Sequence, residues 1–125
     1  MYVIPQSAAA AASRTIFFYA VKTADDTGYT SNLLASELRI SKAGGAEANA
    51  TNGSTHLGGG LHSLVLTTTE CNTQGFLAVR LNQATCYGEA IICNIVAFNP
   101  YDAAALGLSN LALDAILTAP NGVFV

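Results

Sequence analysis

Short segments in which apolar side chains recur at every second residue constrain this chain most strongly. The clearest of them are residues 14–22, 38–41, 61–67, 76–81 and 90–98. A period of two is that of a β-strand, because successive side chains of a strand point to opposite faces of its sheet. Short strands separated by polar and glycine-rich stretches predict an all-β protein, an antiparallel β-sandwich of the immunoglobulin-like or jelly-roll-like type.

The alternation also assigns side chains to the two faces of each strand. In residues 14–22, Ile16, Phe18 and Ala20 share one face, while Phe17, Tyr19 and Val21 share the other. Since both faces are apolar, we expect the second face to be covered by a partner rather than by water. The predicted core consists of much of residues 91–98 together with Ile16, Phe18, Leu38, Ile40, Leu64, Leu66, Leu77, Val79 and Leu81.

Turn residues and a proline divide the chain. Paired glycines in residues 42–46 predict a tight hairpin, and the Thr-x-x-Glu pattern of residues 67–70 is typical of a capping box at a corner between strands. Pro100 ends the last strand, and Asp102 begins a short, partly helical C-terminal arm. The predicted organisation is an N-terminal arm at residues 1–13, a sandwich domain at 14–99 and a C-terminal arm at 100–125.

Composition excludes several classes of partner. The 125 residues carry only 10% charged side chains and a net charge of -3 without a basic cluster, so we expect no binding to nucleic acid. No apolar run approaches the roughly 20 residues that span a bilayer, so no membrane partner is expected. Cys71, Cys86 and Cys93 lack CxxC spacing, and we expect three buried free thiols, with a disulfide left open as the alternative.

Candidate chemistry in the sequence is sparse. A metal site would need His56 and His62 together with Glu47, Glu70 or Glu89, but no HxH or HExxH spacing places such ligands on one element. No GxSxG motif surrounds a serine, and the glycines of residues 58–60 precede a strand instead of opening a helix. We therefore expect no catalytic residue, no metal and no cofactor, that is, a protein that is not an enzyme.

Several strings, taken in order, resemble a β-sandwich module of tailed-bacteriophage structural proteins, found in tail fibres and minor virion proteins. The resemblance covers roughly residues 14–111 and differs at Leu61-His62, where such modules place an aromatic pair. The strings are Arg14-Thr-Ile-Phe-Phe-Tyr, Leu38-Arg-Ile-Ser-Lys-Ala-Gly-Gly-Ala, Thr55-His-Leu-Gly-Gly-Gly-Leu-His, Leu66-Thr-Thr-Thr-Glu, Asn94-Ile-Val-Ala-Phe-Asn-Pro-Tyr-Asp-Ala and Leu106-Gly-Leu.

The resemblance implies a virion structural protein, synthesised in the host bacterial cytoplasm, that decorates or stabilises the capsid or tail surface. Its expected partners are further copies of the chain, in a trimer, and other phage capsid or tail proteins. The alternative is a tail-fibre or tail-tip adsorption module, or a carbohydrate-binding domain that contacts host surface glycans. The candidate subunit interface comprises Phe17, Tyr19, Val21, Leu111, Leu113, Ile116, Leu117 and Phe124.

The C-terminal arm carries many large apolar residues for a tail exposed to water, so its side chains require a place to be buried. We expect the arm to tie one copy to its neighbour or to an underlying shell protein. The alternative is that the arm folds back over its own sandwich.

Overall fold

A computed structural model describes residues 1–97 of the chain; the predicted C-terminal arm and Phe98 lie outside the described residues. The described part is built from strands and two short 3-10 turns, η1 (Ala11–Arg14) and η2 (Ala35–Glu37). Its strands are β1 (Tyr2–Pro5), β2 (Thr15–Tyr19), β3 (Leu38–Lys42), β4 (Ala48–Asn49), β5 (Thr55–Gly58), β6 (Leu61–Val65), β7 (Gly75–Leu81) and β8 (Ala90–Val96). None of the helices in residues 1–97 is long and apolar enough to cross a membrane.

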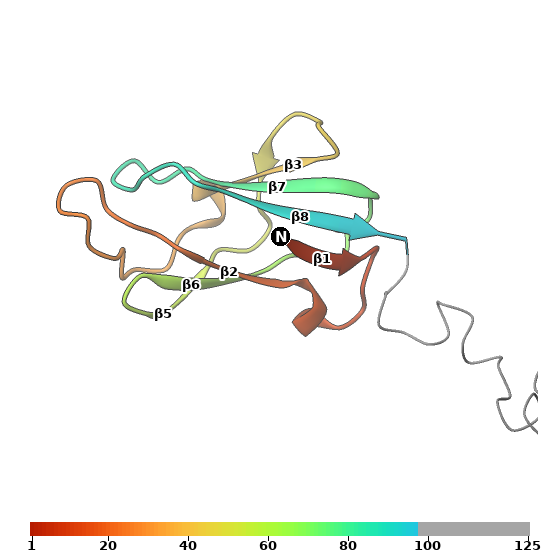
Figure 1. The fold of residues 1–125 in the computed structure, drawn as a ribbon, viewed down its shortest axis with the longest axis horizontal. Helices are drawn as coiled ribbons and strands as arrows, with labels where there is room; N and C mark the ends of the chain where they lie inside the picture. Colours follow the sequence, from red (N-terminus) through yellow and green to blue (C-terminus); the bar gives the residue numbers. More distant parts are fainter. Residues whose placement is uncertain (98–125) are drawn as a thin grey trace, which may run out of the picture.

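The strands form two sheets that face each other across the core (Figure 1). One sheet has the order β1-β8-β7-β3-β4 and the other has the order β2-β6-β5. Lettered A′, B, C, C′, D, E, F and G in chain order, the strands give an A′GFCC′ sheet over a BED sheet. This is the immunoglobulin-like alternative of the two sandwich types. The all-β fold expected from the sequence is confirmed.

The N-terminal strand corrects two expectations. Residues 2–5, expected to lie in an arm outside the domain, form β1 and contribute the buried Ile4 to the core. β1 runs parallel to β8, with Tyr2 opposite Cys93 and Pro5 opposite Val96, so the sandwich is not wholly antiparallel. Four residues ending in proline are too short to display a period of two, and their pairing partner lies at the far end of the domain sequence.

β2 is shorter than the predicted strand at residues 14–22. It ends at Tyr19, and Ala20 makes one further bond along the same pair of strands, since its N–H donates to the carbonyl of Gly60, next to β6, at 3.0 Å. Val21 and Lys22 then form isolated bridges with Gly28 and Cys86. The uninterrupted apolar pattern concealed this change of partner, because alternation reports only which face a side chain takes.

The interior follows the predicted register. All nine individually predicted core residues are buried, and β8 turns Cys93 and Ile95 inward. Leu64 and Leu66 have exposed fractions of 0%, while Ser63 and Val65 are half-buried on the outer face. Ala20 and the imidazole of His62, which the alternation of residues 14–22 and 61–67 also places on the inner faces, are buried as well, and the structure adds further members that the alternation did not indicate, namely Ile4, Leu33, Ala50, Cys71 and Cys86.

Both predicted turn signals form. β3 and β4 are joined by the hairpin, where Gly44 takes a φ of +81° and the Ser41 hydroxyl donates to the Gly45 carbonyl at 2.6 Å. At the corner between β6 and β7, the N–H of Thr67 donates to Glu70 Oε1 at 2.7 Å, and the N–H of Glu70 donates to Thr67 Oγ1 at 3.1 Å. These reciprocal bonds are those of a capping box, formed here around a turn.

Candidate functional site

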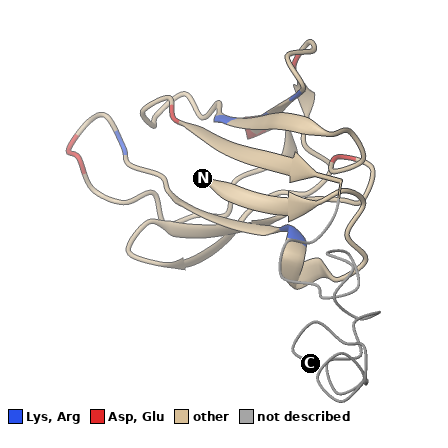
Figure 2. Ribbon diagram, turned by 45° about the vertical axis from the view of Figure 1, so that its right-hand side comes forward, with Lys and Arg blue, Asp and Glu red and all other residues tan. Residues whose placement is uncertain are grey.

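The outer face of the three-stranded sheet presents apolar and uncharged polar side chains. Phe17 and Tyr19 of β2 have exposed fractions of 47% and 58%. Their partners on β6 are Ser63 and Leu61, so aromatic and aliphatic groups lie side by side across the two strands. No Lys, Arg, Asp or Glu occurs in β2, β5 or β6, and Figure 2 shows charge colours on other parts of the fold.

The structure brings together only part of the predicted subunit interface. Phe17 and Tyr19 share the exposed face, as the alternation requires. Val21 does not continue that row: it is partly buried beyond the end of β2, and its carbonyl accepts a hydrogen bond from the N–H of Tyr87 at 2.9 Å. The remaining predicted interface residues, which are Leu111, Leu113, Ile116, Leu117 and Phe124, lie outside the described residues.

One tyrosine joins the edges of the two sheets beside this face. The hydroxyl of Tyr2, on β1, accepts a hydrogen bond from the N–H of Phe17 at 2.9 Å and donates one to its carbonyl at 3.0 Å. The Tyr2 hydroxyl therefore forms hydrogen bonds with both the N–H and the carbonyl of Phe17 at the edge of β2. This contact holds the backbone of Phe17 in place while its side chain remains exposed.

Three loops meet at one end of the sandwich, which we call the loop pole. They connect β2 to β3, β5 to β6, and β7 to β8, and Figure 1 shows the first and third of them opposite the end at which β8 finishes. The N–H of Thr23 donates to the carbonyl of Thr85 at 2.9 Å, and the Gln83 amide donates to the hydroxyl of Tyr29 at 3.3 Å. These bonds connect the first and third loops.

The loop pole exposes an aromatic ring next to acidic residues. Tyr87 is 50% exposed, and its hydroxyl donates to Asp26 Oδ1 at 2.5 Å. This hydrogen bond raises the pKa of Tyr87, since it stabilises the protonated phenol. Bonds from the hydroxyl and N–H of Thr27 lower the pKa of the neighbouring Asp25. The sequence alone did not indicate that Tyr87 lies beside this acidic pair.

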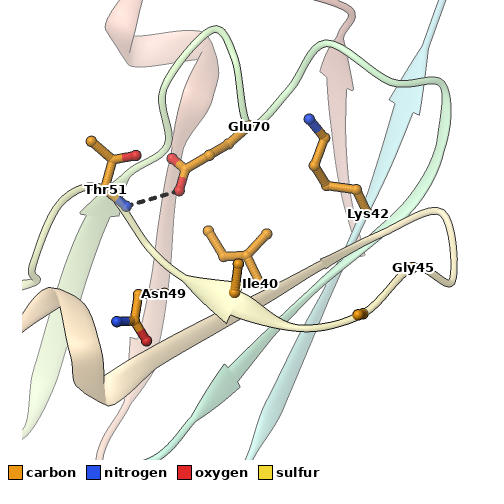
Figure 3. Close-up of a pocket in the computed structure, with 8 residues that line it drawn as sticks. Ile40, Lys42, Gly45, Asn49, Thr51 and Glu70 are labelled. Atoms are coloured by element: carbon orange, nitrogen blue, oxygen red, sulfur yellow. Dashed lines mark hydrogen bonds between the residues drawn. The ribbon is translucent and has the colours of Figure 1, made fainter.

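A shallow pocket of about 450 Å³, part of it open solvent, lies between the β3–β4 hairpin and the β6–β7 corner (Figure 3). Its polar groups already have partners. Glu70 Oε2 accepts a hydrogen bond from the N–H of Thr51 at 3.0 Å, and Lys42 Nζ donates to Asn72 Oδ1 at 2.6 Å and to the Thr69 carbonyl at 2.8 Å. These bonds fasten the corner to the hairpin, so we assign the pocket a structural role.

The two histidine rings lie close together, and His62 is a hydrogen-bonded side chain of the core. His62 is buried; its Nδ1 lies 2.9 Å from the Ser54 hydroxyl and its Nε2 lies 2.8 Å from the Tyr29 carbonyl. Since a carbonyl can only accept, Nε2 carries the proton and Nδ1 accepts from Ser54. Burial lowers the pKa of His62, and the nearby His56 ring, 5.2 Å away between centroids, adds to this effect.

Metal-ligating residues do not gather elsewhere in the described chain. Across residues 1–97, no group of three or more His, Cys, Asp or Glu side chains could hold a metal ion. Glu70, a carboxylate considered with the histidines, instead binds backbone N–H groups at the β6–β7 corner.

The three cysteines are free and buried, as expected. Burial raises the pKa of Cys93 to about 12 and also raises the pKa values of Cys71 and Cys86. A nucleophilic cysteine requires the thiolate, so these thiols resemble small core side chains in their chemistry. They pack in the interior as hydrophobic groups.

The geometry defines an immunoglobulin-like sandwich with one uncharged aromatic face and one pole of clustered loops. No protein-family model, curated protein or solved structure matches this chain. The comparisons therefore do not bear on the resemblance to phage modules.

Proposed function

We propose that this chain is a structural protein of a bacteriophage particle, a small decoration or accessory module that acts by packing against further copies of itself and against capsid or tail proteins. The observation that carries the proposal is the outer face of the three-stranded sheet, where Phe17 and Tyr19 are exposed side by side on strands without charged residues. An apolar sheet face of this kind favours burial against another protein. The phage setting rests on the sequence strings described above.

The partner at this face is a second copy of the chain, and the copies assemble into a trimer. Tyr2 supports it by fixing the backbone of Phe17, so that the exposed ring meets its partner without prior ordering of the strand. Aromatic side chains at such a face contribute large buried areas for few rotatable bonds. The proposal gives the module a mechanical role and assigns it no catalytic residue, cofactor or metal.

The test of the contact is the mass of the full chain in solution, measured by light scattering across a dilution series. Phe17→Asp places a charge in the contact, and we expect the trimer to dissociate at concentrations at least tenfold higher than for the unmodified chain. Ala90→Asp is the matched control, because Ala90 is exposed on the five-stranded sheet. A monomeric unmodified chain, or equal behaviour of the two variants, contradicts the proposed contact.

The test of the phage setting is quantitative mass spectrometry of particles produced from the genome that encodes the chain. A virion structural role requires a fixed copy number relative to the capsid or tail protein. Absence of the chain from purified particles contradicts this role and leaves the solution trimer to be explained separately.

A second candidate function, adsorption to a host surface glycan, is favoured by the loop pole. Exposed Tyr87 offers a ring for stacking on a sugar, and Asp26 and Asp25 offer acceptors for its hydroxyl groups. Glycan-array binding by the full chain that is lost in Tyr87→Ala supports adsorption. Binding to no glycan, or binding that survives this substitution, leaves the structural role as the sole proposal.

A further inference from the structure

A second exposed apolar patch lies on the outer face of the five-stranded sheet. Val3 of β1, Phe76 of β7 and Ile92 of β8 have exposed fractions of 47%, 58% and 39%. Val3 and Phe76 lie on either side of Asn94, which pairs with both, and Ile92 is two residues from Asn94 on the same face. We call Val3, Phe76 and Ile92 the β8 patch.

The β8 patch occupies only one half of this face. The other half is charged: Arg80 and Arg39 are paired across β7 and β3, and the Arg80 guanidinium binds Glu47 at 2.6 and 3.0 Å. Because β8 runs antiparallel to β7, the apolar half lies toward the end at which β8 finishes (Figure 1). The patch therefore adjoins the point where the chain leaves the sheet.

The segment that continues from this point has the composition to cover such a patch. Residues 98–125 contain two charged residues, Asp102 and Asp114, and no Lys or Arg. Their large aliphatic and aromatic side chains include Leu106, Leu108, Leu111, Leu113, Ile116, Leu117, Val123 and Phe124. Exposed to water, these groups would lose the favourable free energy that burial of apolar surface provides.

We propose that residues 98–125 fold back and dock on the β8 patch of their own molecule. Val96, the last residue of β8, lies two residues from Asn94, so the segment begins beside its docking site. A short connection of this kind gives the segment an effective concentration in the millimolar range at the patch, well above that of a second copy in dilute solution. Of the two placements considered from the sequence, the fold favours the intrachain one.

This docking is independent of the proposed subunit contact. The patch belongs to the five-stranded sheet, whereas Phe17 and Tyr19 face outward from the opposite sheet. The arm then covers an apolar surface of the module and leaves the aromatic face of β2 free for a neighbouring copy. Failure of one proposal therefore leaves the other standing.

The experiment is hydrogen–deuterium exchange on the full chain, followed by mass spectrometry of peptides from residues 103–125. We expect these amides to exchange at least tenfold more slowly in the unmodified chain than in Phe76→Asp, which places a charge in the patch. Phe17→Asp is the matched control, since it makes the same change on the opposite sheet and should leave the exchange of the segment unaltered. A double variant of the segment, Leu111→Asp with Leu113→Asp, tests the same contact without any substitution in the described strands. It should raise the exchange of the backbone amides of residues 75–78 and 91–94.

Four outcomes overturn the proposal. In the first, residues 103–125 exchange at the unprotected rate in the unmodified chain. In the second, they are protected equally in the unmodified chain and in Phe76→Asp, which would mean that the segment docks elsewhere. Protection that disappears on dilution assigns the segment to the patch of a second copy. If Phe76→Asp does not fold, judged by near-ultraviolet circular dichroism, the segment double variant decides: unchanged exchange at the patch overturns the docking.

Discussion

At the scale of single residues, glycines set the geometry of the loop pole. Gly28 lies so close to the β5–β6 turn that a Cβ at this position would meet the Gly59 carbonyl oxygen at 2.3 Å. The same holds at Gly60, where an added Cβ would lie 2.6 Å from the Gly28 Cα. Gly60 also takes a φ of +96°. Two backbones meet here without side chains between them, which requires glycine on both sides.

Gly28→Ala should lower the free energy of unfolding by about 1–3 kcal/mol, the usual cost of overpacking, because backbone atoms cannot move aside as a flexible side chain can. Gly88→Ala is the control: a Cβ there meets no atom within 4 Å, and the residue does not take a positive φ. Urea denaturation of both variants checks this. Equal stability of the two would show that the loops separate at little cost.

His62 makes the stability of the core depend on pH. Its folded pKa lies below the ordinary value of 6.5, chiefly because of burial. The unfolded chain therefore takes up a proton at a pH at which the folded chain does not, and stability falls as the pH drops below 6.5 toward the folded pKa. Well above pH 6.5 both states are neutral at this site and the contribution is constant.

His62→Gln should accordingly flatten the fall in stability as the pH drops below 6.5, whatever its effect at neutral pH. His56→Gln retains His62 but removes a group that adds to the lowering of its pKa, so this variant should keep a fall in stability over the same range, with a smaller slope than the unmodified chain. Thermal melts across this pH range measure the slopes. A slope in His62→Gln as steep as in the unmodified chain would assign the pH dependence to other groups.

At the scale of elements, corners between strands depend on side chains that bind the backbone. Glu70 is the clearest case, because its two carboxylate oxygens accept the N–H groups of Thr67 and Thr51 from two different segments. One carboxylate thus closes the β6–β7 corner and fastens it to the chain that follows β4. Charge-assisted bonds to backbone N–H groups are among the stronger hydrogen bonds in proteins.

Glu70→Ala should lower the free energy of unfolding by about 1–3 kcal/mol, because two partly buried N–H groups lose their acceptor. Glu70→Gln retains one oxygen and should recover part of the loss. Glu89→Ala removes a glutamate from an exposed position as the control. These comparisons require only denaturation curves, and a Glu70→Ala variant as stable as Glu89→Ala would show that water replaces the carboxylate.

At the scale of the whole molecule, the sandwich separates its surfaces. The aromatic face lies on one sheet, the β8 patch lies on the other, and the loop pole lies at the end opposite the finish of β8. A module of this kind can contact a neighbour, hold its own arm and present loops at once. Under the proposed virion role, each surface has a distinct task.

The double variant Phe17→Asp with Phe76→Asp tests this separation. Because the two side chains point outward from opposite sheets, we expect independent effects: the mass should fall as in Phe17→Asp alone, and the segment should exchange as in Phe76→Asp alone. The changes in unfolding free energy should add to within about 0.5 kcal/mol. A combined effect beyond this range would show that arm and subunit contact are coupled.

Much of the fold was predictable from local pattern. Alternation identified the strands that became β2, β3, β6, β7 and β8 and placed Leu64 and Leu66 inside, and turn chemistry located the hairpin at Gly44 and the corner at Glu70. For the candidate site, the same alternation placed Phe17 and Tyr19 on the outer face. These features depend on residues within a few positions of one another, and the backbone geometry of strands and turns expresses them directly.

The tertiary structure alone decided which segments meet. The pairing of Tyr2 with Cys93, the bridge between Lys22 and Cys86 and the contact of Gly28 with Gly59 join residues that are distant in sequence, so no local period records them. The same holds for the β8 patch. An outward Phe76 is by itself a single exposed side chain, and it becomes part of a patch only because Val3, from the other end of the chain, also pairs with Asn94. Sequence alternation determines the face of a side chain, but the neighbours on that face depend on strand order, which the packing of the whole core selects.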